Sequence, residues 1–112
     1  MDYQKYVVSR EGKDITLDVN GEELKLKVRS VPWSLKNSII SRCSKFVEGA
    51  LVFDGDAYVK ESLKYMIVEA PWGQTTEVFL SSINEDLGGA LESLVPRADS
   101  KKTSNVDSLK KE

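Results

Sequence analysis

The chain has no histidine and only one cysteine, Cys43. Histidine is the usual acid–base group near neutral pH and the commonest metal ligand, so its absence removes the ordinary routes to both functions. One cysteine cannot form an internal disulfide, which suits a reducing compartment. A nucleophilic thiolate also needs a basic partner, which histidine would normally supply. The sequence therefore predicts no catalytic residues, no metal site and no cofactor, and we expect a protein that is not an enzyme.

Long apolar runs are missing as well. No stretch approaches the roughly 20 residues of a membrane-spanning helix, and Met1–Lys5 lacks the apolar run of a signal peptide. With 40% hydrophobic and 30% charged residues, the composition is typical of one soluble domain. We expect a cytoplasmic protein with no membrane partner.

A strong excess of one charge is also lacking, since the net charge is −2. Residues 1–95 carry 11 basic and 15 acidic side chains, whereas residues 96–112 carry 5 basic and 3 acidic ones. An acidic body does not favour contact with phosphates, so nucleic acid is an unfavourable partner. A small nucleic-acid-binding or regulatory protein stays open as an alternative to a protein-binding one.

The clearest pattern present is the alternation of apolar residues between positions 15 and 28. They stand at 15, 17 and 19 and again at 24, 26 and 28, on either side of Asn20-Gly21. This pair favours the positive φ angles of a type I′ turn. A two-residue loop sets Leu17 opposite Leu24 and Ile15 opposite Leu26, which places these side chains on one face over a core. Residues 6–8 are a candidate third strand.

Two amphipathic helices are predicted to follow. The first begins with Ser34 as its N-cap, carries an apolar stripe as far as Val47 and ends at Gly49. The second begins with Asp56 as its N-cap and is ended by Pro71, because the residue before a proline disfavours the helical conformation.

The segment after the second helix is less regular. Residues 76–80 fit either a short helix or a strand, and Ser82 with Glu85 has the spacing of a capping box. A leucine stripe continues from there until Pro96. The pair Gly88-Gly89 either weakens this helix, by about 1 kcal/mol per glycine relative to alanine, or permits close approach of another helix.

These elements predict a single α+β domain over residues 1–96. Its fold class is an N-terminal antiparallel β-hairpin or small sheet packed on three to four α-helices. Residues 97–112 contain too few apolar side chains to offset the entropy of ordering, so we expect a disordered, flexible polar C-terminal tail there.

Aromatic residues are the best candidates for contact with a partner, since tryptophan and tyrosine are enriched in binding hot spots. Each tryptophan either seals the edge of the core or anchors a partner. Trp72 is the better anchor, because a Pro-Trp-Gly corner can project its ring outward. The expected site is an apolar groove that receives an amphipathic partner helix. Its candidate partner-binding residues are Trp33, Tyr65, Trp72 and Phe79.

The order of elements runs through a hairpin, two helices, a Pro-Trp corner and terminal helical segments. It is carried by Ile15–Val28, Trp33–Phe46 and Asp56–Leu94, and most locally by Tyr65–Trp72 and Leu91–Val95. This order resembles the tail assembly chaperones of tailed viruses and prophages. The resemblance implies a non-enzymatic assembly factor in the host cytoplasm, which shields the apolar helices of a tape-measure protein and recruits tail-tube subunits.

The resemblance also implies that the polar tail is where a longer, frameshifted form diverges. A minor structural virion protein is a further alternative, and a homo-oligomer is compatible with the sequence. The identity of the partner, the oligomeric state and the host organism are not determined by the sequence.

Overall fold

In the computed structural model, which describes residues 3–96, the predicted hairpin is formed by β1 (Lys13–Val19) and β2 (Glu22–Val28). The strands are antiparallel, with Leu17 opposite Leu24 and Ile15 opposite Leu26, as predicted. Asn20 and Gly21 have φ angles of 53° and 86°, which a type I′ turn requires. Local sequence is therefore sufficient to fix this hairpin and its register.

The third strand of this sheet is β5 (Ile67–Glu69), which pairs antiparallel with β2 in the order β1-β2-β5. The prediction of a third strand at residues 6–8 was wrong. Tyr3–Tyr6 forms a single 3₁₀ turn, η1, and residues 7–8 lie outside any strand. The edge of β2 is instead taken by a segment some 40 positions later in the chain, which the end of α2 delivers directly to it.

Helix α1 (Trp33–Arg42) starts after Pro32, and no side chain caps its N-terminus, so Ser34 is not the N-cap. The predicted continuation to Gly49 was wrong. The helix ends at Arg42, and β3 (Ser44–Val47) and β4 (Ala50–Phe53) form a second antiparallel hairpin. The apolar spacing across residues 43–47 suits a helix as well as a strand, and pairing with β4 decides between them.

Helix α2 (Gly55–Met66) is capped by Asp54, whose carboxylate accepts a hydrogen bond from the Ala57 N–H at 3.1 Å. Asp56 was predicted to be the cap but lies in the first turn. The helix also ends before the predicted stop at Pro71. Residues 67–69 leave it because the unpaired edge of β2 offers them hydrogen bonds of a sheet.

Helices α3 (Glu77–Ser82) and α4 (Glu85–Glu92) complete the described fold, so residues 76–80 are mainly helical. The N-cap of α4 is Asn84, whose side chain accepts from the Leu87 N–H at 3.1 Å, and the predicted capping box at Ser82 was wrong. The alternative prediction, that Gly88-Gly89 permits close approach of another helix, was wrong too. An added Cβ at Gly89 would meet nothing within 4 Å, and one at Gly88 would meet only the Ile83 side chain.

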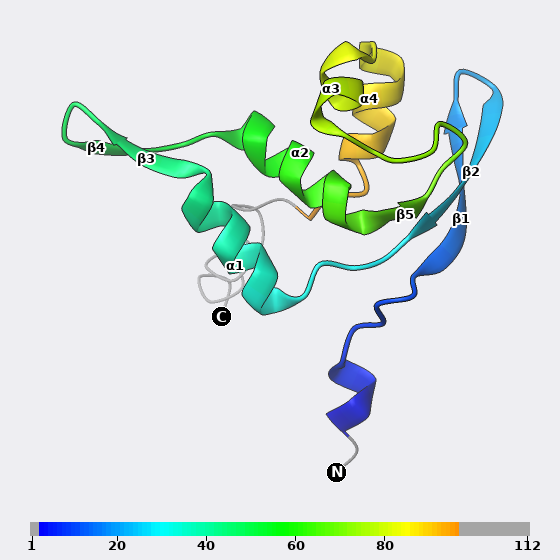
Figure 1. Ribbon diagram of the computed structural model, residues 1–112, viewed down its shortest axis with the longest axis horizontal. Helices are drawn as coiled ribbons and strands as arrows, with labels where there is room; N and C mark the ends of the chain where they lie inside the picture. The colour runs from blue at the N-terminus through cyan, green and yellow to red at the C-terminus, as the bar shows by residue number, and fades with distance from the viewer. Residues whose placement is uncertain (1–2, 97–112) are drawn as a thin grey trace, which may run out of the picture.

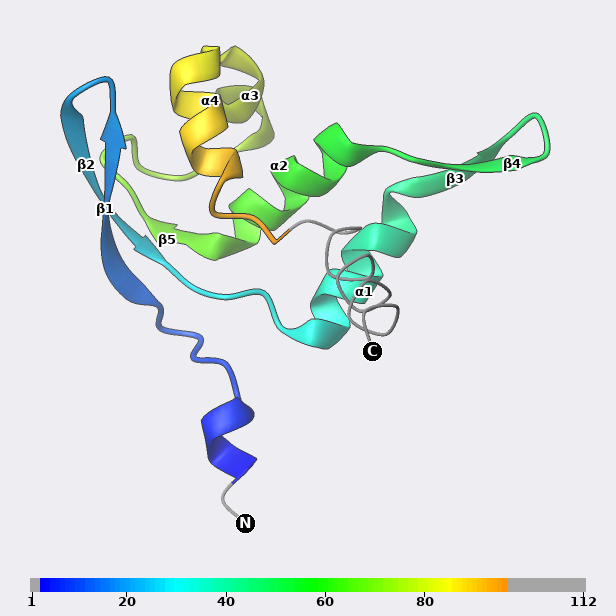
Figure 2. The same cartoon turned by 180° about the vertical axis from the view of Figure 1, so that it is seen from behind.

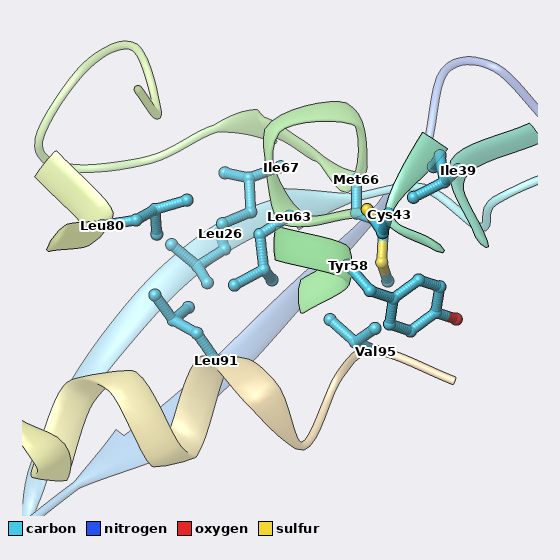
Figure 3. Packing of buried hydrophobic residues seen from close by; sticks show 10 residues of the cluster. All are labelled: Leu26, Ile39, Cys43, Tyr58, Leu63, Met66, Ile67, Leu80, Leu91 and Val95. Atoms are coloured by element: carbon cyan, nitrogen blue, oxygen red, sulfur yellow. The ribbon is translucent and has the colours of Figure 1, made fainter. Parts of the chain in front are cut away.

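Helix α2 lies at the centre of the fold, in contact with α1, α3, α4 and β5 (Figure 1). In Figure 3, Leu26 of β2, Leu63 of α2 and Leu91 of α4 come together in the core. The buried apolar residues are Leu26, Ile39, Cys43, Tyr58, Leu63, Met66, Ile67, Leu80, Leu91 and Val95. The chain is thus α+β, as predicted, and the predicted tail over 97–112 lies outside the described residues.

Two segments extend away from this core. In Figures 1 and 2, the β3–β4 hairpin points away from the helices, and η1 lies at the end of a separate extension of the chain. The radius of gyration of the Cα atoms is 16.0 Å, whereas a compact domain of this length has about 13 Å. The described chain is therefore less compact than a typical domain of this length, because these two segments extend from the core.

Candidate protein-binding surface

The β3–β4 hairpin, residues 44–53, is the most exposed apolar element, and we call it the arm. Its register sets Phe46 opposite Leu51 and Val47 opposite Ala50. Glu48 and Gly49 connect the strands with φ angles of 53° and 83°, the geometry of a two-residue hairpin turn. Aromatic and β-branched side chains favour strands on both sides of this turn.

The arm presents apolar side chains on both of its faces. Phe46 and Leu51 form a cross-strand pair on one face and are 76% and 64% exposed. Val47 and Val52 lie on the other face and are also exposed. With Phe53, these side chains expose roughly 500 Å², taking about 200 Å² for each large side chain when fully exposed. This area is divided between the two faces, and together it is comparable to the roughly 300–600 Å² of the largest apolar patch on a typical monomer, which is often functional.

The base of the arm is held firmly to the helices. The Asp54 N–H donates to the Cys43 carbonyl at 2.7 Å, and the Ser44 hydroxyl donates to the Ile40 carbonyl at 2.7 Å. The Phe53 ring packs on the Tyr58 ring with a centroid distance of 5.6 Å. The arm is therefore presented in a defined direction although its outer half has few contacts.

A cleft of about 780 Å³ opens beside the base of the arm, between α2 and α4. Its lining residues are Phe53, Gly55, Asp56, Tyr58, Val59, Gly89, Glu92, Ser93, Val95 and Pro96. The Tyr58 hydroxyl donates to the Pro96 carbonyl, which joins α2 to the chain after α4. The cleft continues from the Phe53 side of the arm and combines apolar walls with carboxylates at its rim.

The electrostatics near this cleft disfavour nucleophilic chemistry. Burial raises the pKa of the Cys43 thiol, and the carboxylates of Glu61 and Asp54 raise it further. Burial also raises the pKa of Tyr58, against a smaller opposing effect of its hydrogen bond with Ser62. Both groups therefore keep their protons at neutral pH, and a protonated thiol is a poor nucleophile.

Of the four sequence-predicted residues, the structure brings together only Trp72 and Phe79. Their rings stack with a centroid distance of 4.7 Å, and the Trp72 Nε1–H donates to the Thr75 hydroxyl at 2.9 Å. The ring thus lies half-buried against the fold, so the expectation that the Pro-Trp-Gly corner projects it outward was wrong. A role of this pair in partner binding stays a prediction.

The other two predicted residues lie apart from that pair. Trp33 begins α1 and is 74% exposed, so it is the more exposed of the two tryptophans. Tyr65 lies on α2, where the Arg29 guanidinium stands 3.8 Å from its ring centroid and the Arg29 Nε–H donates to its carbonyl at 2.8 Å. Tyr65 therefore helps to hold the end of β2 against α2.

Sequence reasoning missed the arm because it assigned Phe46 and Val47 to the buried stripe of a helix. A signal was present in the apolar run Ala50–Phe53, which follows Gly49 and has the length of a strand. Together with residues 44–47, this run has the form of a short hairpin around Glu48-Gly49.

Within residues 3–96, no cluster of three or more histidine, cysteine, aspartate or glutamate side chains is placed to hold a metal ion. In the same part of the chain, no helix has the length and apolar character that crossing a membrane requires.

Comparisons with known proteins give no family assignment. No protein-family model matches the chain, and no significant match was found among curated proteins or solved structures.

Proposed function

We propose that this protein is a non-enzymatic assembly factor that binds apolar segments of another protein on its arm. The observation that carries the proposal is the arm itself, an element with exposed apolar side chains on both faces and a rigid base. An isolated two-stranded hairpin is only marginally stable in water, so contact with another chain would stabilise it.

The order of elements predicted from the sequence resembles that of tail assembly chaperones and suggests one biological setting for this activity, to which the structure adds the arm between α1 and α2. In that setting the partner is a tape-measure protein, whose long apolar helices need shielding before the tail tube assembles, and tail-tube subunits are recruited afterwards. An amphipathic helix offers a continuous apolar stripe, which matches the row formed by Phe46, Leu51 and Phe53 on one face of the arm.

The experiment is co-expression of the full chain with the tape-measure protein of the same virus or prophage. A photo-reactive phenylalanine analogue replaces Phe46 in one sample and Val78 in the control. The control position is matched because Val78 is 77% exposed but lies on α3, away from the arm. We expect light-dependent crosslinks to the tape-measure protein from position 46 and none from position 78.

A second measurement separates binding from folding. The double variant Phe46→Ser, Leu51→Ser removes the exposed pair and should abolish co-purification while far-UV CD and thermal unfolding stay close to wild type. Equal capture by this variant and by wild type would refute the proposed use of the arm. A shift of DNA or RNA that fades steeply with salt, with no capture of protein, would favour the nucleic-acid-binding alternative instead.

A further inference from the structure

The outer edge of β4 is an open strand edge. Within residues 3–96, the sheet that contains it has only the strands β3 and β4. The Asp54 N–H binds the Cys43 carbonyl, so this pair is hydrogen-bonded, and antiparallel strands alternate bonded with non-bonded pairs. By this alternation the main-chain groups of Leu51 and Phe53 point away from β3. They are therefore placed to pair with another strand.

The two edges of the arm differ in how favourably each can pair with the same edge of a second copy. Pairing of β3 with β3 of a second copy through the outward-facing main-chain groups of 44 and 46 would bring 44 opposite 46 and set Lys45 directly opposite Lys45. Like charges in that position are destabilising, and lysine is a common device for protecting strand edges. The corresponding pairing of β4 through the outward-facing groups of Leu51 and Phe53 sets Val52 opposite Val52, and no charged residue lies within Ala50–Phe53.

We propose that β4 pairs with β4 of a second copy of this chain, antiparallel about a two-fold axis at Val52, to form one four-stranded sheet. Leu51 then exchanges two main-chain hydrogen bonds with Phe53 of the second copy, and symmetry repeats the exchange. The side chains of Leu51 and of Phe53 from the second copy share a face of the new sheet. A strand edge that is unpaired in the monomer becomes paired.

This dimer goes beyond the proposed function, because it uses the edge of the arm and leaves both faces available to a partner. It also extends each apolar face across four strands instead of two. The edge alone buries less than the roughly 800 Å² per partner of a standard interface. We therefore expect a reversible dimer, with a dissociation constant on the order of micromolar or weaker.

The first test is sedimentation velocity of the full chain over a concentration series. Wild type should shift from a 12.5 kDa monomer towards twice that mass as concentration rises. Val52→Lys should remain monomeric, since it places two ammonium groups opposite each other at the axis. Because Lys45 already lies opposite position 52 within the same arm, folding of the arm is checked by the far-UV CD spectrum of this variant, which should match that of wild type. Val68→Lys is the matched control, because Val68 is also a strand valine and is 42% exposed against 44% for Val52.

Charge complementation tests the register. Val52→Lys and Val52→Glu should each be monomeric alone, and an equimolar mixture should dimerise because opposite charges then face each other. A wild type that stays monomeric throughout the concentration range, or a dimer that survives Val52→Lys, would overturn the inference. Loss of the dimer in Val68→Lys as well would point to another interface and overturn it too.

A cysteine at the axis gives a geometric check. Directly opposed residues in a non-hydrogen-bonded antiparallel pair have Cα atoms about 4.5 Å apart, within the range of about 4.4–6.8 Å for disulfides. Val52→Cys should therefore oxidise to a covalent dimer, whereas Ala50→Cys, which would face Asp54 of the second copy, should not. Crosslinking of tape-measure protein at position 46 without any dimer would leave the proposed function standing and refute only this inference.

Discussion

Gly12 and Gly21 allow the steric effect of a single methyl group to be separated from backbone strain. Both glycines have left-handed φ angles, +84° and +86°. A Cβ on Gly21 would meet nothing within 4 Å. A Cβ on Gly12 would lie 2.8 Å from the carbonyl oxygen of Val28 and 3.3 Å from the N of Arg29.

The two alanine variants should therefore differ in stability although their backbone strain is the same. Alanine in a left-handed conformation lowers the free energy of unfolding by roughly 1–2 kcal/mol. The smaller conformational entropy of the unfolded alanine variant offsets about 0.4–1 kcal/mol of this loss. Gly21→Ala should thus lose about 1 kcal/mol of unfolding free energy. Gly12→Ala should lose about 1–3 kcal/mol more, because the atoms it meets belong to the main chain and cannot rotate away.

Urea unfolding followed by far-UV CD measures this difference. With an m-value of about 1–1.5 kcal/mol/M for a chain of this size, a difference of about 2 kcal/mol separates the two midpoints by about 1.3–2 M. Wild type and both variants should show the same m-value. Equal midpoints for Gly12→Ala and Gly21→Ala would refute the close packing of the residue before β1 against the end of β2.

Three further predictions concern the core, a helix cap and pH. Leu91→Ala should cost about 2–5 kcal/mol in urea unfolding, since Leu91 is fully buried, whereas Val78→Ala on the exposed side of α3 should leave the midpoint nearly unchanged. Asp54→Ala should lower the free energy of unfolding by about 1 kcal/mol because it removes the N-cap of α2, and Asp56→Ala should lower it less. A larger loss in Asp56→Ala would instead indicate that Asp56 is the N-cap, as predicted from the sequence. Burial raises the pKa of Tyr58 above its ordinary value of 10.0, so the unfolded chain loses this proton first and stability falls as pH rises past 10; urea titrations at a series of pH values should show a shallower fall for Tyr58→Phe.

Sequence alone was a good guide where short-range rules decide the structure. Asn20-Gly21 fixed the type I′ turn, and the alternation around it fixed which residues face each other in β1 and β2. It was a poor guide at helix ends. Asp54 and Asn84 cap their helices in place of Asp56 and Ser82, because several short polar side chains stand close together and the path of the backbone selects among them.

The binding surface was harder to predict than the fold. Whether an aromatic ring is exposed depends on what the rest of the chain places against it. Trp72 is half-buried because its ring stacks on Phe79 and donates a hydrogen bond to Thr75. Trp33 at the start of α1 remains exposed. Neither outcome is written in the residues next to each tryptophan.

The amino-acid sequence by itself determined the α+β class and the N-terminal hairpin. These follow from composition and from interactions between residues close together in the chain. Only the tertiary structure decided that 44–47 and 67–69 are strands and not the ends of two helices. Both segments have spacings that suit either conformation, so the hydrogen-bonding edges available to them selected the strand, and in residues 44–53 that selection created the arm.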